Sequence, residues 1–211
     1  MPGAPNRPPD PAPTVPAAPP VPVTPQQAAL RRLAPSRVAL RLDLWKGAPH
    51  PELLAPFDKA EAAFAAGDFP NATSALDLLA VRFAEPRWPT LPAPFKLLRV
   101  PIPAPMPPAW NPEHGLPPAE RDARRARRDA EEQLELATGS IAWADAHGVP
   151  LTELAPVLAE ARTLLDTEGP GAAFYERIDR AWETVRARVP RPEAARGRPA
   201  PPAPEPEAGA A

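Results

Sequence analysis

The sequence predicts an all-α protein, built from two related antiparallel helical units that are joined by an extended proline-rich strap and flanked by disordered proline-rich termini. Two observations lead to this prediction. The 38 prolines are concentrated in three stretches, and proline fixes φ and donates no backbone hydrogen bond, so helices are expected between these stretches. In the intervening residues, apolar side chains recur every three or four positions, which is the helical period.

The proline distribution divides the 211 residues into five segments. Eleven prolines lie in the first 25 residues, twelve in 86–118 and seven in the last 22. The two tails are rich in proline and alanine and carry too few bulky apolar side chains to offset the entropy lost on ordering. The predicted segments are a tail, a first helical unit, a strap, a second helical unit and a tail, with bounds 1–26, 27–85, 86–118, 119–189 and 190–211.

Composition excludes several classes of protein. The net charge is −2, so no global charge favours nucleic acid or an anionic membrane. Cysteine is absent, which excludes disulfides, zinc–thiolate sites, iron–sulfur clusters and a cysteine nucleophile. No signal peptide is visible, and no run approaches the roughly 18 apolar residues of a membrane span. The expected location is the cytoplasm.

A short pattern occurs twice, about 100 residues apart, at 47–56 and 148–156. Both copies read Gly-x-Pro-x-x-Glu-Leu and then Ala-Pro, with one additional leucine in the first. The similarity continues weakly beyond the pattern, since Leu78 and Ile178 occupy corresponding positions. The pattern indicates one helical unit used twice, by duplication or by convergence, although alanine and proline matches also arise by chance in this composition.

Each unit is expected to open with a helix that ends at a glycine. The first is predicted at 36–46 with Ser36 as N-cap, and the second at 119–147. Gly47 and Gly148 then suit the left-handed residue that follows many helices. The alternation in 38–44 is also typical of a strand, but 95–100 is its only candidate partner, so a helix is preferred.

A helical hairpin follows in each unit, with turns at 67–70 and 169–171. Short connections of this kind make two helices antiparallel neighbours. The predicted apolar stripes are Leu53, Phe57, Ala60, Phe64, then Ala72, Ala75, Leu76, Leu79, Phe83 in the first unit, and Leu154, Val157, Leu158, Ala161, Leu165, then Phe174, Ile178, Ala181, Val185, Val189 in the second.

The hairpin 57–83 resembles part of a tetratricopeptide repeat. The matching residues are Ala60, Phe64, the Gly67-Asp68-Phe69 turn, Ala72 and Leu76. The helix-opening tryptophan and the leucine–glycine pair are missing, and the pattern does not recur at the period of about 34 residues. The resemblance implies a helical hairpin. It also implies peptide binding in a concave groove, which is the function of that family.

The strap 86–118 and the helix start 119–132 each allow two interpretations. The strap carries many bulky apolar residues, Trp88 and Trp110 among them, so we expect it to pack across the helices; alternatively, it is a recognition element for a partner. The arginines of 119–132 are balanced by acids, and Arg125–Asp129, Arg127–Glu131 and Arg128–Glu132 are spaced for surface ion pairs. The alternative is a nucleic-acid-binding helix assisted by Arg188, Arg191, Arg196 and Arg198.

The sequence predicts no catalytic, cofactor-binding or metal-ligating residue. His50, His114 and His147 form no metal-binding pair, and Ser36, Ser74 and Ser140 have no evident base. Asn71-Ala72-Thr73 fits a glycosylation pattern but is interpreted as the start of a helix. Trp45, Trp143 and Trp182 are explained by packing.

The predicted function is a non-catalytic protein-interaction or scaffold module, in which a groove between helical hairpins receives a segment of an unidentified protein partner. The alternatives are a nucleic-acid-associated protein that uses 119–132 and an enzyme with an unrecognised site. Strong nucleic-acid binding and membrane association are not expected.

Overall fold

The computed structural model describes residues 23–41, 50–88, 91–99 and 115–192; helices take up 79% of them, and none forms a strand. The all-α prediction is confirmed, and none of the described helices is both long and apolar enough to cross a bilayer. In chain order the elements are α1 (Pro25–Leu40), α2 (Pro51–Ala65), α3 (Phe69–Ala84), the 3-10 helix η1 (Ala93–Leu98), α4 (Pro118–Ala146), the 3-10 turn η3 (Thr152–Leu154), α5 (Ala155–Thr167) and α6 (Ala172–Arg188).

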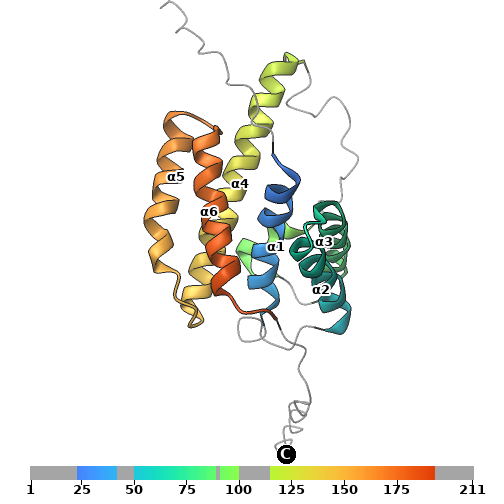
Figure 1. The fold of residues 1–211 in the computed structure, drawn as a ribbon. Coiled ribbons are helices and arrows are strands. Elements are labelled where there is room, and N and C mark those ends of the chain that lie inside the picture. Colours follow the sequence, from blue (N-terminus) through green and yellow to red (C-terminus); the bar gives the residue numbers. More distant parts are fainter. Residues whose placement is uncertain (1–22, 42–49, 89–90, 100–114, 193–211) are drawn as a thin grey trace, which may run out of the picture.

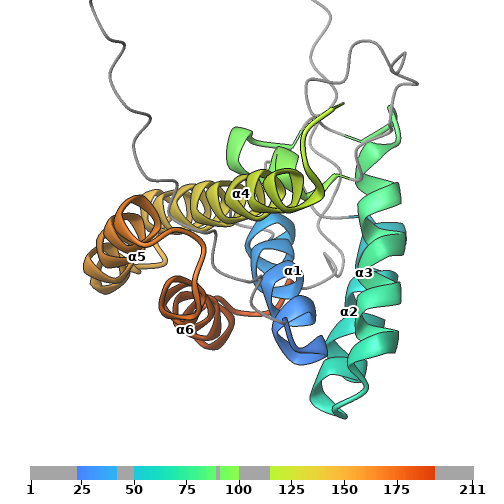
Figure 2. The same cartoon turned by 90° about the horizontal axis from the view of Figure 1, so that it is seen from above.

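Helix α1 is the central element of the fold (Figure 1). Figure 2 shows it between the α2–α3 hairpin on one side and α4 and α6 on the other. From Ala29 to Leu40 every residue except Arg32 is buried. A helix enclosed on all sides shows no single polar face, so the arginines within α1 need partners from neighbouring helices.

The predicted start of the first helix, with Ser36 as N-cap, is wrong. The helix begins at Pro25, where the Thr24 side chain accepts from the Gln27 N–H and the Gln27 side chain accepts from the Thr24 N–H. This reciprocal capping box satisfies two backbone donors. Pro35 lies inside α1, and the Ser36 hydroxyl donates to the Arg32 carbonyl one turn earlier. The helix ends at Leu40, and residues 42–46 of the prediction lie outside the described residues.

Both predicted hairpins are confirmed. Helices α2 and α3 pack together, as do α5 and α6, and the glycines after α2 and α5 have positive φ (77° at Gly67 and 82° at Gly169). Every residue of the predicted stripes is buried, apart from the half-buried Phe64 and Val157. The paired positions Leu78 and Ile178 differ, since Leu78 is 54% exposed and Ile178 is fully buried.

Helix α4 occupies the predicted range, displaced by one residue, and its end has the expected glycine. Gly148 has φ of 85° and donates to the Asp145 carbonyl, while the Val149 N–H donates to the Ala144 carbonyl at 2.9 Å. These two bonds form a Schellman motif, which satisfies carbonyls left free at the end of a helix. Gly47, the matching residue of the first unit, lies outside the described residues.

The described part of the strap packs on the helices, as expected, but it is not extended throughout. Residues Ala93–Leu98 form η1, which contacts α4 and α1. Leu91 and Phe95 are buried, whereas Trp88 is half-buried against the core. Residues 100–114, including Trp110, lie outside the described residues. One apolar core runs from Leu30 to Val189 and takes side chains from both helical units and from the strap.

Candidate binding groove

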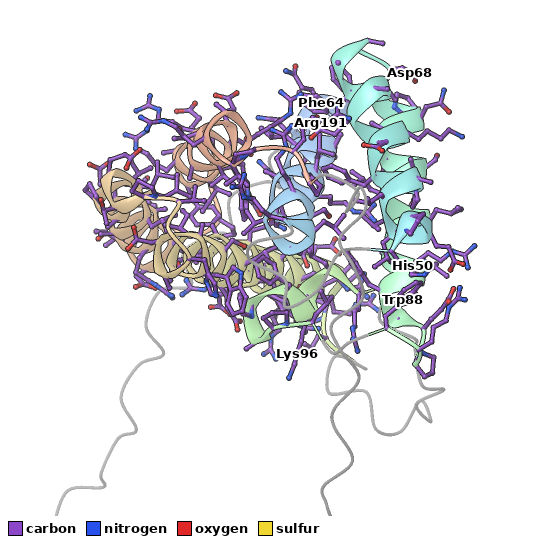
Figure 3. All side chains as sticks on the ribbon, turned by 90° about the horizontal axis from the view of Figure 1, so that it is seen from below. His50, Phe64, Asp68, Trp88, Lys96 and Arg191 are labelled. Atoms are coloured by element: carbon purple, nitrogen blue, oxygen red, sulfur yellow. The ribbon has the colours of Figure 1, made fainter. Side chains whose placement is uncertain are left out.

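The histidines lie apart from one another. His50 precedes α2, with its ring centroid 5.3 Å from that of Trp88 (Figure 3). His147 ends α4, where its Nδ1 lies 2.7 Å from the Trp143 carbonyl oxygen and its ring stacks on the indole. His114 is outside the described residues, within which no group of three or more histidine, aspartate or glutamate side chains could hold a metal ion.

The polar residues singled out in the sequence have local roles. Ser36 bonds within α1, Ser74 is exposed on α3, and Ser140 is buried in α4 with no hydrogen-bond partner for its hydroxyl among the described residues. Asn71 lies in the first turn of α3, where its N–H donates to the N-cap residue Asp68. The interpretation of Asn71 as part of a helix start is therefore confirmed.

The arginines of 119–132 are largely engaged within the chain. Arg127 pairs with Glu131 at 2.8 Å, as predicted, and it also reaches α5 through the Asp166 carboxylate and the Leu165 carbonyl. Arg124 pairs with Glu120 at 2.9 Å. Arg125 and Arg128 also interact within the chain. These contacts leave few guanidinium groups available for phosphates.

The C-terminal arginines named in the nucleic-acid alternative are also paired where they are described. Arg188 lies 3.5 Å from a Glu153 carboxylate oxygen, and Arg191 lies 3.1 Å from one of Asp58. Arg196 and Arg198 lie outside the described residues.

Two buried ion pairs that the sequence did not indicate connect α1 to its neighbours. Arg31 forms a two-point contact with Asp179 of α6, with Nε–Oδ1 at 2.6 Å and Nη2–Oδ2 at 3.0 Å, and Gln27 donates to the same carboxylate. The Arg31 guanidinium also lies 4.4 Å from the Tyr175 ring centroid. Each partner is far away in the sequence, so no local spacing points to this pair.

The second buried pair joins three helices. Arg37 of α1 contacts Glu61 of α2 at 3.2 Å and donates to the Arg186 carbonyl of α6, and the Arg186 guanidinium lies 3.7 Å from the Glu61 carboxylate. Burial lowers the pKa of Arg37, Glu61 opposes that shift, and the nearby cations Arg186 and Arg191 add to it. These groups hold α1, α2 and α6 in register, and they line no cavity described below.

A largely apolar hollow of about 410 Å³ lies between α4 and α5. Its floor is formed by Leu134, Ile141 and Leu158, which are at most 7% exposed. The remaining lining residues are small or polar and exposed: Thr138, Ala142, Asp145, Thr152, Ala155, Ala159 and Arg162. Because alanines stand where larger side chains would fill the space between the two helices, the floor stays accessible.

A second hollow of about 550 Å³ continues the first toward η1. Thr138 and Arg162 line both, and the second is completed by Ala93, Pro94, Glu131, Glu135 and Gly139. Together they form what we call the α4 groove, which runs from η1 across α4 to α5. Pockets that hold ligands have volumes of about 300–1,000 Å³, and both hollows fall within that range.

Charged side chains stand along the edge of the α4 groove. Glu131 is paired with Arg127. Among the described residues no ion pair forms at Glu135, Asp145 or Arg162. Glu135 and Asp145 are ten residues apart on α4, which corresponds to about 15 Å along the helix axis. The groove therefore has an apolar floor and two available carboxylates against one guanidinium, and its lining includes no histidine or serine.

Comparison of the chain with protein-family models, with curated proteins and with solved structures gives no match. Helices α2 and α3 do form the antiparallel hairpin that the tetratricopeptide resemblance implies. The hollows described above lie on α4, α5 and η1, away from that hairpin.

Proposed function

We propose that the protein is a non-catalytic interaction module whose α4 groove binds an amphipathic helical segment of a protein partner, with an apolar stripe and basic residues near its two ends. The observation that carries the proposal is the open apolar floor between α4 and α5. The proposed location of the protein is the cytoplasm, as the sequence predicts.

The apolar floor favours a helix as occupant. An amphipathic helix presents apolar residues at i, i+3, i+4 and i+7, and a groove between two helices receives such a stripe. Alanines at 142, 155 and 159 leave room above Leu134, Ile141 and Leu158 for side chains of leucine size. Each side chain buried in this way would contribute about 1.5–3 kcal/mol before the cost of association is subtracted.

The charges at the edge favour a basic partner. Glu135 and Asp145 lack ion-pair partners among the described residues and stand at different points along the groove. A partner helix aligned with α4 would meet both with lysines or arginines about ten residues apart. Arg162, on the α5 side, suits an acidic residue or the terminal carbonyls of the partner helix.

The two alternative functions are less well supported. The arginines of α4 that suggested nucleic-acid binding mostly contact acids of the same chain. An enzyme needs a nucleophile or an acid–base pair within hydrogen-bond reach of a bound substrate, and the lining of the α4 groove offers only threonine hydroxyls beside its charged residues.

A defined peptide tests the proposal. The probe is a synthetic amphipathic helix with leucines at i, i+3, i+4 and i+7 and lysines about ten residues apart, titrated into the ¹⁵N-labelled full chain. We expect amide shifts confined to residues 131–145 and 155–162. A peptide with glutamates in place of the lysines should bind about tenfold more weakly or worse, because it faces Glu135 and Asp145.

Matched variants of the protein separate binding at the groove from binding elsewhere. Ala142→Trp fills the groove and should abolish the shifts, whereas Ala62→Trp, at an exposed position on α2, should leave them unchanged. Asp145→Lys should remove most of the preference for the lysine peptide, because Glu135 then remains as one negative site opposite one positive site. Shifts that map to the α2–α3 hairpin, or equal binding by Ala142→Trp, would refute the proposal.

A further inference from the structure

The 3-10 helix η1 lies between two cavities. Its first residues, Ala93 and Pro94, line the second hollow of the α4 groove, which measures about 550 Å³. Its last residues, Leu97 and Leu98, line a separate pocket of about 260 Å³ between α1, α3, η1 and α4. The interior of a protein is normally close-packed, so a short segment with a cavity on either side has room to shift.

The residues of α4 show that the two cavities lie on opposite sides of η1. Glu135 lines the second hollow, and Leu136 lines the pocket. Successive residues of an α-helix are about 100° apart around its axis, so Gly139 lies between the faces that carry Glu135 and Leu136. A Cβ on Gly139 would lie 2.3 Å from the Pro94 Cβ, which places η1 directly on this strip of α4. Movement of η1 away from the groove is therefore movement toward the pocket.

The interactions of η1 allow a small shift. Phe95 is buried and attaches the segment to the core, whereas Lys96 and Leu97 are exposed. The Phe95 N–H donates to the Pro92 carbonyl at 2.9 Å, and the Arg99 N–H donates to the Lys96 carbonyl at 3.2 Å. Hydrogen bonds in a 3-10 helix have poorer geometry than those in an α-helix. Displacing η1 should therefore cost less free energy than displacing α4, against which it packs.

We infer that η1 is a movable element that couples the α4 groove to this pocket. A partner helix that fills the second hollow presses on Pro94 and shifts η1 toward the pocket, which becomes narrower. A side chain that fills the pocket holds η1 toward the groove and weakens partner binding. Such coupling is reciprocal, because each occupant changes the affinity for the other by the same factor. The regulation of the groove rests on the proposed function, whereas the movement of η1 does not.

Gly139→Ala tests the movement of η1 without a partner. The added methyl group would lie 2.3 Å from the Pro94 Cβ, so it pushes η1 in the direction of the pocket. We expect the methyl resonances of Leu97, and of Leu76 across the pocket on α3, to shift in the full chain, while those of Leu53 on α2 stay unchanged. In a Pro94→Gly background the same substitution should leave all three unchanged. Shifts confined to the immediate neighbours of residues 94 and 139 would overturn the inference.

Ala80→Leu tests the coupling from the other side. Ala80 lines the pocket on α3, so a larger side chain there fills the space toward which η1 moves. The lysine peptide described above should bind this variant about fivefold more weakly or worse, the lower end of couplings between sites. The matched Ala62→Leu, at an exposed position on α2, should bind like wild type. Thermal melts verify that both variants are folded.

The outcomes of the peptide titration separate the coupling from the proposed function. Equal binding by Ala80→Leu and Ala62→Leu would overturn the coupling and leave the α4 groove as the binding site. Failure of the peptide to bind the wild-type groove would refute the proposed function together with its regulation. In that case the Gly139→Ala resonances still decide whether η1 moves between the two cavities.

Discussion

Arg31 and Asp179 are 148 residues apart in the chain, yet they meet in a two-point ion pair whose side chains are 8% and 11% exposed. The pair joins the first described helix to the last. The Arg31 side chain is 8% exposed, so its charge is largely withdrawn from water and depends on Asp179. The contact therefore specifies which face of α6 packs on α1.

Breaking this pair should be strongly destabilising. Asp179→Ala leaves Arg31 buried without its carboxylate, and the loss of one partner of a buried pair costs about 3–5 kcal/mol. The matched control is Asp77→Ala, because the Asp77–Arg32 pair is exposed and such pairs contribute about 1 kcal/mol or less. Urea denaturation of both variants measures the difference. Equal stabilities would mean that the buried pair does not hold α6 to α1.

The Gly139–Pro94 contact should not tolerate a methyl group. Alanine is normally better than glycine inside a helix by about 1 kcal/mol. A Cβ on residue 139, however, would lie 2.3 Å from the Pro94 Cβ, and overpacking typically costs about 1–3 kcal/mol. We expect Gly139→Ala to destabilise the protein but to stabilise a Pro94→Gly background, as measured by chemical denaturation. The same sign in both backgrounds would contradict this packing.

Within the strap, Phe95 should matter more than Trp88. Phe95 is fully buried and Trp88 is half-buried, so Phe95→Ala should cost about 3–5 kcal/mol and Trp88→Ala less. Thermal melts of the two variants establish the order. If both melt like wild type, η1 does not contribute to the core. The sequence also predicts a large loss for Trp110→Ala, which remains a prediction because Trp110 lies outside the described residues.

Tyr175 should titrate above its ordinary range. Burial raises the pKa of its phenol, Asp129 and Asp179 add to the shift, and Arg31 opposes it. A proton held more tightly in the folded state stabilises it fully below the unfolded pKa of about 10, and this contribution is lost as the pH rises further. Tyr175 is the only tyrosine, so tyrosinate absorbance reports on it directly. A titration at or below the ordinary value would contradict its burial against Phe174 and Arg31.

Binding to generic DNA should be weak and should disappear near physiological salt. Arg124 and Arg127 already contact carboxylates, so few guanidiniums can displace counterions from phosphates. Fluorescence anisotropy with a labelled random duplex, over a series of salt concentrations, measures this. Tight binding with a steep salt dependence would favour the nucleic-acid alternative over the interaction module.

Local rules were sufficient for the hairpins and for α4. These elements depend on features that act within one or two helical turns, namely the spacing of Phe57 and Phe64, the glycine at 67 and the Gly148 cap. Such features can be predicted from the sequence. Local sequence also contains the true start of the first helix, because Thr24 and Gln27 form a capping box; the predicted start at Ser36 is wrong because α1 continues through Pro35. The α4 groove could not be foreseen, because an alanine stripe is consistent with either a tight helix contact or an open hollow.

Capping, proline geometry and helical periodicity depend on neighbours in the chain, so they allow helices to be predicted from local sequence. Which helices pack together depends on long-range contacts that local patterns do not encode. The partners of Arg31 and Arg37 lie on segments that are distant in sequence. Burying a charge without a partner costs free energy, so these ion pairs are needed for the stability of the buried arginines.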